Sequence, residues 1–403
     1  MTLPSRVLHV LNSAAGGAAL STLGLIQAFA ERGISSSAVC HDAGSEFERG
    51  MLRDAVEGRV LFTPLFWWNR KTRAAAWKRP LLELRQCLRT GFGRGSYRKT
   101  LDFAERNRVD LIHTNTIVNR EGAETALALG IPHVWHVREL VGKDKFCALP
   151  LEGPALGKYL AERSSVVVAN SHACGSSISP WMEEPRLRVV PNGINVEAFS
   201  PRSHNATASD RLKIGVVANL TSRVKNHRLV VESAAVVDSS LPIEYRFYGH
   251  DPCQGEGRKD PYAQGVHDSV RRLGLGDRVR FMGFVDDPVR IMSEIDLLVH
   301  PTEQESFGRI LVEAMAAGLP VVAPNGGGPG EIVVHEETGL LFEPNQRVDL
   351  ARCVERLCRD ASLRRRMGEN GRLRAEKLYS LNRYVEGMLK VYEQAMQSQP
   401  TRN

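Results

Sequence analysis

Near its N-terminus the chain reads RVLHVLNSAAGGAALSTLGLIQAFAERG, residues 6–33. The apolar, β-branched run Arg6–Leu11 predicts a strand, and the small residues Asn12–Gly17 predict a loop. Ala18–Arg32 has the pattern of a helix that ends at Gly33. A strand, a glycine turn and a helix in this order are typical of a parallel βαβ unit.

The same order begins again in the middle of the chain. Leu212–Ala218 predicts a strand that leads through Asn219–Arg223 into a helix near Lys225–Val237. The segment 197–211 is polar and fits a linker. The sequence therefore predicts an α/β protein of two doubly wound, Rossmann-like domains, 1–196 and 212–379, whose ligand sites lie at the carboxyl ends of their strands.

The composition excludes disordered, collagen-like and disulfide-scaffold proteins. The 403 residues carry a formal charge of only +7 and 42% apolar residues, which is an ordinary globular composition. Seven scattered cysteines with no C-x-x-C pair indicate a reducing compartment. Because the chain has neither a signal-like apolar stretch nor 18 consecutive apolar residues, we expect a cytoplasmic location.

The densest chemical signal is HPTEQESFGRILVEAMAAGLPVV, residues 300–322. Here a strand ends, a polar loop follows, and a helix begins near Arg309, where free backbone N–H groups favour negative or hydroxyl-rich ligands. Glu305 and Glu313 lie on either side of this helix start and can accept hydrogen bonds from sugar hydroxyls. The simpler interpretation is that they are solvated charges near a helix start, but the glycine cluster 326–328 after the next strand favours a ligand site.

The stretch from Glu305 to Glu331 resembles the signature of the retaining glycosyltransferases of family four, which have the GT-B fold. The shared pattern is a glutamate, seven residues, a second glutamate, E-A-M-A-x-G-x-P-V-V and then G-G-x-x-E. The motifs at 191–195 and 281–285 extend the similarity. It implies two Rossmann-like domains facing a central cleft, with residues 380–403 packing back on the first domain.

The resemblance also implies roles for residues of the second domain. In such enzymes the second glutamate, here Glu313, binds the ribose of a nucleotide diphosphate sugar, and the first, Glu305, contacts the donor sugar. Lys225 fits the family lysine that neutralises the diphosphate. Asn219 stands where the family has an arginine, so Arg223 is the candidate for the second charge. Further donor contacts are expected from Phe307, Gly308, Gly327 and Gly328.

In the first domain, Gly16 and Gly17 resemble the family's glycine loop and are expected to contact the donor phosphates. His136 matches the catalytic histidine near the transferred sugar, and His113 with the pair 138–139 are expected on the acceptor side. The catalytic set implied by the resemblance is Glu305, His136 and Lys225, and the acceptor-side set is Arg138, Glu139 and His113.

These assignments imply transfer of a hexose from a UDP-sugar or GDP-sugar to a hydroxyl acceptor with retention of configuration. The chain has no Asp-x-Asp motif, so we expect no metal and no other cofactor. The alternative is a non-catalytic nucleotide-sugar-binding or scaffold protein, which the missing arginine at Asn219 favours. Neither a G-x-G-x-x-G nor a P-loop motif is present, which argues against nicotinamide and P-loop enzymes. The sequence does not distinguish the nucleobase, sugar, acceptor or oligomeric state.

The positive charge is concentrated at residues 67–99, which hold ten basic residues against Glu83 alone, a net charge of +9. Aromatic residues are interleaved with these charges, including Trp67 and Trp68. Such a segment fits an anionic membrane surface, and hence a peripheral place on the inner face of the membrane and a lipid-linked or envelope-glycan acceptor. A solvated helical hairpin or a polyanionic acceptor is the alternative, and no nucleic acid is expected.

Overall fold

The computed structural model describes residues 3–42, 45–68, 95–142, 145, 147–182, 186–199, 211–254 and 260–398. The chain forms two compact units, residues 1–193 with 381–403 and residues 194–380. No described helix is long and apolar enough to cross a membrane. The predicted linker at 197–211 lies mostly outside the described residues. The described cysteines are all free thiols.

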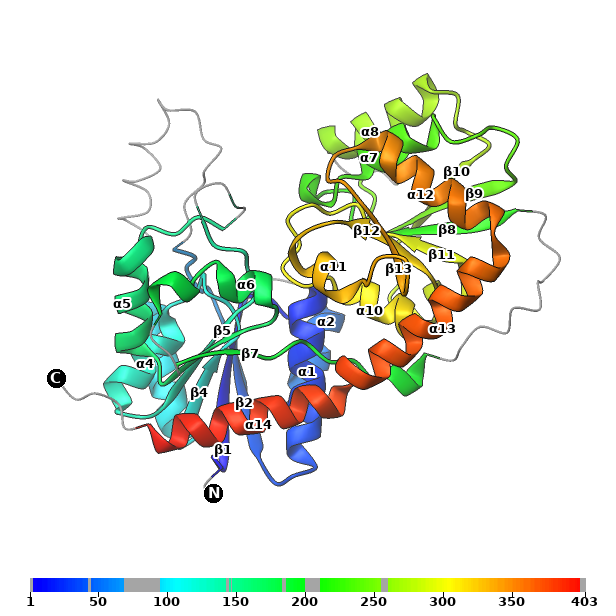
Figure 1. Cartoon of the computed structure of the whole chain (residues 1–403). Coiled ribbons are helices and arrows are strands. Elements are labelled where there is room, and N and C mark those ends of the chain that lie inside the picture. Colours follow the sequence, from blue (N-terminus) through cyan, green and yellow to red (C-terminus); the bar gives the residue numbers. More distant parts are fainter. Residues whose placement is uncertain are drawn as a thin grey trace. The chain divides into compact units, whose positions relative to one another are not determined.

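The first unit is a seven-stranded parallel sheet with the strand order β3-β2-β1-β4-β5-β6-β7 (Figure 1). Its strands are β1 (Arg6–Leu11), β2 (Ser35–His41), β3 (Val60–Thr63), β4 (Leu111–Thr114), β5 (His133–Val137), β6 (Val166–Ala169) and β7 (Leu187–Val189). Its helices include α1 (Gly16–Ala30), α2 (Glu46–Ala55), α4 (Glu121–Leu129), α5 (Gly153–Arg163), α6 (His172–Ser176) and α14 (Leu381–Gln397), with a 3₁₀ turn at Ser179–Trp181. Residues 95–106 are also helical.

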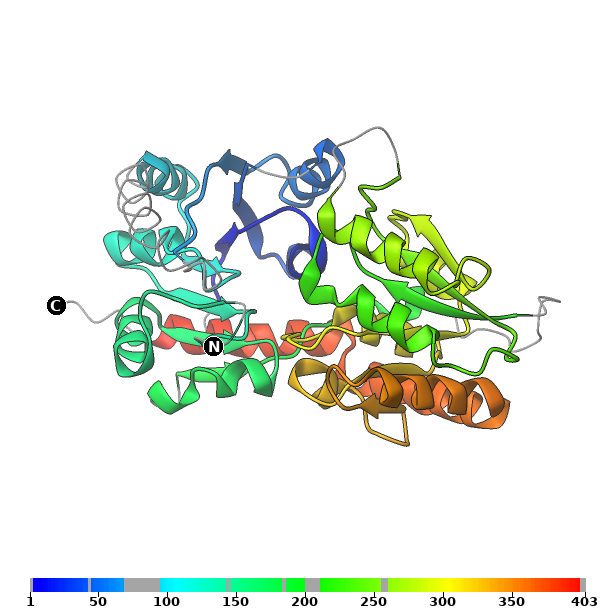
Figure 2. The same ribbon diagram turned by 90° about the horizontal axis from the view of Figure 1, so that it is seen from above.

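Both faces of this sheet are buried, because its strands are apolar on both sides. Along β1, Val7 packs with α1 and α14, while Leu8 packs on the opposite face with residues such as Ala126 of α4. The helix α14, red in the figures, lies beside the strands of the first sheet in both views (Figure 1 and Figure 2) and contacts α1, β5 and β6. The predicted packing of the C-terminal helix on the first domain is thus confirmed.

The second unit is a six-stranded parallel sheet with the order β10-β9-β8-β11-β12-β13. Its strands are β8 (Leu212–Val217), β9 (Ile243–Tyr248), β10 (Val279–Gly283), β11 (Leu297–Val299), β12 (Val321–Pro324) and β13 (Gly339–Phe342). Its helices are α7 (His227–Ala234), α8 (Pro261–Arg272), α9 (Pro288–Glu294), α10 (Arg309–Ala316), α11 (Gly327–Ile332), α12 (Arg347–Arg359) and α13 (Ala361–Leu378), with 3₁₀ turns at Val196–Ala198 and Arg223–Lys225.

The two sheets have the same doubly wound order, in which the first strand of each lies between its second and fourth strands. The strand order therefore reverses at β1/β4 in the first unit and at β8/β11 in the second. In open α/β sheets, ligands bind outside the carboxyl ends of the strands at such switch points. The predicted two-domain α/β architecture is confirmed, and it places the loops after β1, β4, β8 and β11 at candidate sites.

The second unit begins at Ile194, which the sequence assigned to the first domain. Its N–H donates to the Tyr379 carbonyl at 3.0 Å. Ile194, Val196 and Phe199 are buried in the apolar core of the second unit, together with Tyr379. Because the apolar side chains of this stretch pack with the second core, its composition alone did not reveal the unit to which it belongs.

Candidate functional site

The loop after β11 and the turn after β8 bring two opposite charges together in the second unit. Lys225 Nζ lies 2.6 Å from Glu305 Oε2, although the two residues are 80 positions apart in sequence. The Lys225 side chain is 33% exposed and the Glu305 side chain 17%, so solvent reaches both. Two of the three predicted catalytic residues thus form one contact at the switch point of the second sheet.

His300, at the end of β11, is a third member of this cluster that the sequence did not single out. Its Nε2 lies 3.5 Å from Glu305 Oε2. Burial alone would raise the pKa of Glu305, but Lys225 and His300 outweigh burial and hold that pKa well below its usual range. Burial lowers the pKa of His300, which keeps it neutral. The cluster therefore presents an ionised carboxylate next to an ammonium group.

Glu313 lies on α10 and is almost fully buried. Its Oε1 accepts a hydrogen bond from Arg309 Nε at 2.7 Å, one turn earlier on the same helix. Burial raises the pKa of Glu313 despite Arg309. Arg309 is another site residue that sequence reasoning missed, although its i,i+4 spacing from Glu313 is a signal that could have found it.

The glycines after β12 allow the backbone to pass very close to the Glu305 loop. A Cβ on Gly327 would lie 2.6 Å from the Glu305 carbonyl oxygen, and one on Gly328 would lie 2.4 Å from Phe307 Cα. The Gly328 N–H donates to the Glu305 carbonyl at 2.9 Å. These glycines hold the Glu305 loop in place through its backbone.

The structure also shows where three other residues predicted to contact the sugar donor lie. Phe307 is buried and packs edge-on against Tyr379, so only its backbone is available to a ligand. Gly308 precedes α10 with φ of +98°, a conformation that favours glycine. Asn219 is exposed, and its Oδ1 accepts a hydrogen bond from the His250 N–H at 2.8 Å. Asn219 therefore supports a neighbouring loop and supplies no charge.

Arg223 is exposed in the same turn as Lys225 and forms no ion pair with any described residue. It therefore places a second exposed cation in the turn of Lys225, where its role as the second charge stays a prediction. In the first unit, Gly16 and Gly17 are exposed at the start of the fifteen-residue helix α1, whose N-cap residue Ala15 makes no side-chain cap. The backbone N–H groups at this helix start are suited to a negative ligand.

The predicted acceptor-side residues form a buried polar network in the first unit. His113 and His136 have no exposed surface, and His113 Nε2 lies 3.2 Å from His136 Nδ1. His113 Nδ1 lies 2.8 Å from the hydroxyl of Tyr392 on α14. Arg138 donates to Asn192 Oδ1 at 2.6 Å, and also to Asn115 Oδ1 and to the Tyr384 hydroxyl.

This network determines which nitrogen of His136 carries the proton. Arg138 Nη2 lies 3.3 Å from His136 Nδ1, and a guanidinium can only donate, so Nδ1 accepts. Burial and the neighbouring Arg138 lower the pKa of His136 well below its usual value, so the ring is neutral with its proton on Nε2. No described residue pairs with that buried N–H. Among the described residues, the His136 Nε2–H is therefore a donor without a partner.

Glu139 accepts hydrogen bonds from the Thr116 hydroxyl, from the Ile117 N–H at 3.1 Å and from the Arg138 N–H at 3.0 Å. Burial raises its pKa. These bonds use both carboxylate oxygens and hold the loop after β4 against the end of β5. The structure thus gives Glu139 a positioning contact within the loops of the first unit.

The basic segment 67–99 lies largely outside the described residues, but its first two residues, Trp67 and Trp68, are described. Trp68 is only 5% exposed, stacks near Trp135, and donates from Nε1 to the Ile117 carbonyl at 2.5 Å. The sequence counted Trp68 among the aromatic residues of a surface patch, and that assignment is wrong because the indole is part of the core. Trp67 is 49% exposed. Docking on an anionic membrane stays a prediction.

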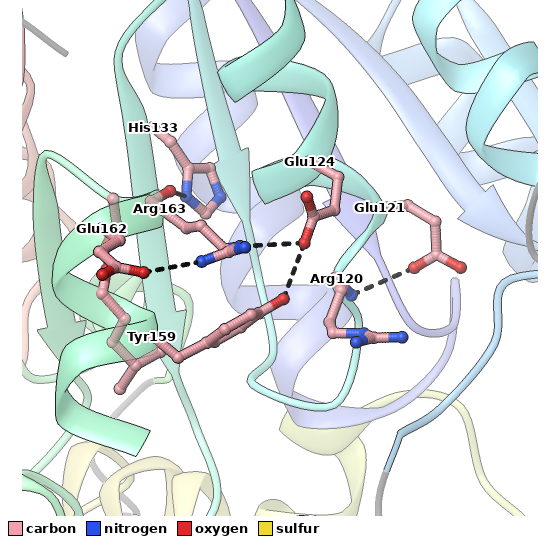
Figure 3. Close-up of polar contacts among 9 residues, drawn as sticks. Arg120, Glu121, Glu124, His133, Tyr159, Glu162 and Arg163 are labelled. Atoms are coloured by element: carbon pink, nitrogen blue, oxygen red, sulfur yellow. Dashed lines mark hydrogen bonds and ion pairs between the residues drawn. The ribbon is translucent and has the colours of Figure 1, made fainter. Parts of the chain in front are cut away.

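Beside Trp68, a set of ion pairs and hydrogen bonds ties α4 to α5 (Figure 3). Glu124 accepts from the Tyr159 hydroxyl at 2.9 Å and from Arg163 Nε at 3.1 Å. The Tyr159 ring lies 5.1 Å from the Trp68 ring, and the Arg120 guanidinium lies 5.2 Å from that indole. The polar groups of Glu124, Tyr159 and Arg163 bond to one another, so we interpret them as structural residues that help to hold Trp68 in place.

Comparison with known proteins agrees with this geometry. Residues 15–198 match the family described as Glycosyltransferase Family 4, and residues 200–374 match Glycosyl transferases group 1. N-acetyl-alpha-D-glucosaminyl L-malate synthase of Bacillus anthracis is 25% identical over 311 residues, 70% of this chain and 75% of that protein. D-inositol 3-phosphate glycosyltransferase of Salinispora tropica is 30% identical over 262 residues, 61% of this chain and 54% of that protein, so the match spans about half of that relative.

Solved structures show the same fold. The crystal structure of Anabaena HepE in complex with UDP and glucose has a TM-score of 0.76 at 20% identity, covering 96% of this chain and 99% of that chain. Sucrose-phosphate synthase of Thermosynechococcus elongatus has a TM-score of 0.72 at 20% identity, covering 96% and 98%. With its two doubly wound sheets and with both family regions present, the chain belongs to the group 1 glycosyltransferases of family four and has the GT-B fold.

Proposed function

We propose that this glycosyltransferase moves a sugar from a nucleotide diphosphate sugar to a hydroxyl acceptor, with retention of configuration and without a metal at the diphosphate. The observation that carries the proposal is the solvent-accessible contact between Lys225 and Glu305 at the switch point of the second sheet. The relatives whose names state an activity act on sugars, and the Anabaena structure holds UDP and glucose.

The charges of the second unit suit each part of such a donor. Breaking the anomeric C–O bond leaves negative charge on the diphosphate, which fixed cations stabilise in the transition state. Lys225 and the exposed Arg223 supply these cations. Glu305, held ionised, accepts hydrogen bonds from hydroxyls of the donor sugar. Glu313 is positioned by Arg309 through Oε1, which leaves its second oxygen for the ribose hydroxyls.

In the first unit, His136 is the residue proposed to contact the transferred sugar. Its Nε2–H is a buried donor without a described partner, and a buried donor left unpaired costs about 1–3 kcal/mol. A hydroxyl of the bound sugar would satisfy it. Arg138 and His113 orient the ring, and the N–H groups at Gly16 and Gly17 would contact phosphate oxygens. No side chain is assigned as a nucleophile, and the donor phosphate is proposed to take the proton of the acceptor.

The proposal is tested by calorimetry and by single-turnover transfer with a panel of UDP, GDP, ADP and their sugars. Glu313→Ala should weaken nucleotide binding, because the carboxylate that accepts from ribose is lost. The Glu305→Ala variant should still bind nucleotide, and its main defect should be a lower rate of sugar transfer. Glu303→Ala is the matched control, since Glu303 lies in the same loop but contacts the exposed Asn345.

Normal binding and transfer by the variant carrying both Glu305→Ala and Glu313→Ala would sink the assignment. Donor hydrolysis without acceptor is the second readout, because an intact site transfers some sugar to water. If the wild-type protein binds a nucleotide sugar but releases no free sugar, the proposed transfer reaction is contradicted while the binding site remains.

A further inference from the structure

A second polar cluster of the second unit is unrelated to the residues proposed for sugar transfer. It consists of Asp251 and Cys253, in the loop after β9, and His267 on α8. One carboxylate oxygen, the thiol sulfur and one ring nitrogen all lie within 4.8 Å of one another. Within the described part of the chain, this is the one group of three such side chains that converges in this way.

The surrounding contacts already orient two of these donors. Asp251 Oδ1 accepts a hydrogen bond from the Cys253 N–H at 2.9 Å, which leaves Oδ2 to face His267 Nε2 at 2.8 Å. The His267 ring stacks on Phe281, with the ring centroids 3.9 Å apart. The Cys253 N–H is an outer contact on the carboxylate, and hydrogen bonds of this kind orient carboxylate ligands in metal sites.

Burial also suits an ion that enters from solvent. The Asp251 side chain is 1% exposed, whereas His267 is 18% exposed and Cys253 is half-buried. The carboxylate is thus at the inner side of the cluster, and the thiol and imidazole are at its solvent edge. A buried carboxylate needs a charged or hydrogen-bonding partner, which His267 supplies here and which a cation would supply more fully.

The chemical types of the three ligand atoms indicate which metal ion would bind. A thiolate, an imidazole and a carboxylate together suit Zn²⁺, whereas Mg²⁺ and Ca²⁺ take oxygen ligands. Zinc distances of about 2.0–2.3 Å place ligand atoms roughly 3.3–3.6 Å apart in a tetrahedron. The Asp251 and His267 atoms, now 2.8 Å apart, would therefore separate slightly, and the Cys253 sulfur would move toward them to form the site. The ion would displace the proton between His267 and Asp251 and would leave the fourth position to water.

We propose that Asp251, Cys253 and His267 form a zinc site that fastens the loop after β9 to α8. That loop supports the turn that carries Lys225. The His250 carbonyl accepts from the Leu220 N–H at 2.9 Å, and the His250 N–H donates to Asn219 Oδ1. A Cβ on Gly249 would lie 2.3 Å from the Ala218 carbonyl oxygen, so the two loops are in backbone contact. The zinc would therefore brace the donor turn and take no part in transfer.

Titration of the reduced full-length protein with Co²⁺ tests the site directly. The thiolate ligand should give a near-ultraviolet sulfur-to-cobalt charge-transfer band that saturates at a stoichiometric amount of metal and disappears when Zn²⁺ is added. Cys253→Ser and His267→Ala should lose the band. Cys358→Ser is the matched control, because Cys358 is also half-buried in the second unit but belongs to no such cluster of described residues.

Zn²⁺ should also raise the Tm of the wild-type protein and of Cys358→Ser but leave that of Cys253→Ser unchanged. Far-ultraviolet circular dichroism of each variant shows whether it has folded. Absence of the band in the wild-type protein, or an equal band in Cys253→Ser, would overturn the proposal and leave only the hydrogen bond between Asp251 and His267 and the contact of the Cys253 thiol with Gln264. Neither readout depends on sugar transfer.

Discussion

The fourth strands of the two sheets, β4 and β11, occupy the same place in the same strand order, yet the polar clusters at their carboxyl ends differ in exposure. In the first unit, His113 and His136 are fully buried and bonded to Arg138 and α14. In the second, Lys225 and Glu305 remain partly open to solvent. The difference indicates that the first cluster mainly holds a fold together, with one spare donor, whereas the second is arranged for a charged ligand.

The variant with the largest expected effect is Lys225→Met, which tests whether the second cluster serves a charged ligand. Removing one fixed charge opposite a developing negative charge costs about 10²–10³ in kcat, so we expect a loss of that size in sugar transfer. Stability should change little because the pair is partly exposed. Lys158→Met is the control, since that side chain is 78% exposed on α5. A folded Lys225→Met variant with wild-type kcat would show that the second cluster is structural too.

Lowering the pH should destabilise the two units to different extents, because they hold different numbers of buried histidines. Burial lowers the pKa of four histidines in the first unit, to about 3 for His9 and about 4 for His133, and of two in the second, His227 and His300. Because the unfolded chain protonates these histidines below about pH 6.5, each one costs stability as the pH falls from there toward its folded value, by up to about 1.4 kcal/mol per pH unit.

Buried carboxyls with raised pKa values act in the opposite direction, since the folded state binds their protons first. They are Glu121 and Glu139 in the first unit and Glu313 in the second. Glu305, with its lowered pKa, loses its contribution only as the pH falls below about 4.5. The first unit should therefore lose more stability than the second as the pH falls, because it holds two more of these buried histidines and only one more of these carboxyls. Hydrogen exchange of α14 and α12 between pH 7 and pH 5 measures this, and equal loss of protection would contradict it.

The smallest expected effect comes from Tyr392→Phe. It removes the hydroxyl that bonds His113 Nδ1 and should cost about 1 kcal/mol in the free energy of unfolding. Nucleotide affinity should be unchanged, because Tyr392 has no part in the proposed donor site. Urea unfolding with Tyr97→Phe as a half-buried control in the same unit checks the stability. A selective loss of nucleotide binding would instead assign the first cluster a direct role at the ligand.

Much of the fold could be predicted because its signals are local. The strands at Arg6–Leu11, Leu212–Val217 and Ile243–Tyr248 and the final helix follow from apolar periodicity and from glycine stops. The unit boundary was less accurate, because the apolar residues of 194–199 pack with the second core. The position of the boundary depends on which of the two apolar cores these side chains pack into, and the local sequence pattern does not carry that information.

The candidate site was predicted only as a set of residue types. The motif around Glu305 and Glu313, followed by a glycine cluster, was enough to identify the family, and the sugar-nucleotide site that it predicts stays a prediction. It could not show that Arg309 holds Glu313, that Asn219 supports a loop, or that Trp68 is buried. Each of these depends on a side-chain direction that tertiary packing sets.

The repeated strand–turn–helix order, the charged loop after β11 and the family motifs could be recognised without a structure, because each is carried by neighbouring residues. The contact of Lys225 with Glu305, that of His113 with Tyr392, and the convergence of Asp251, Cys253 and His267 follow from the three-dimensional packing alone. The partners in these contacts lie up to 279 residues apart. They meet because strand order and helix packing bring distant segments side by side, and spacing along a chain carries no record of that.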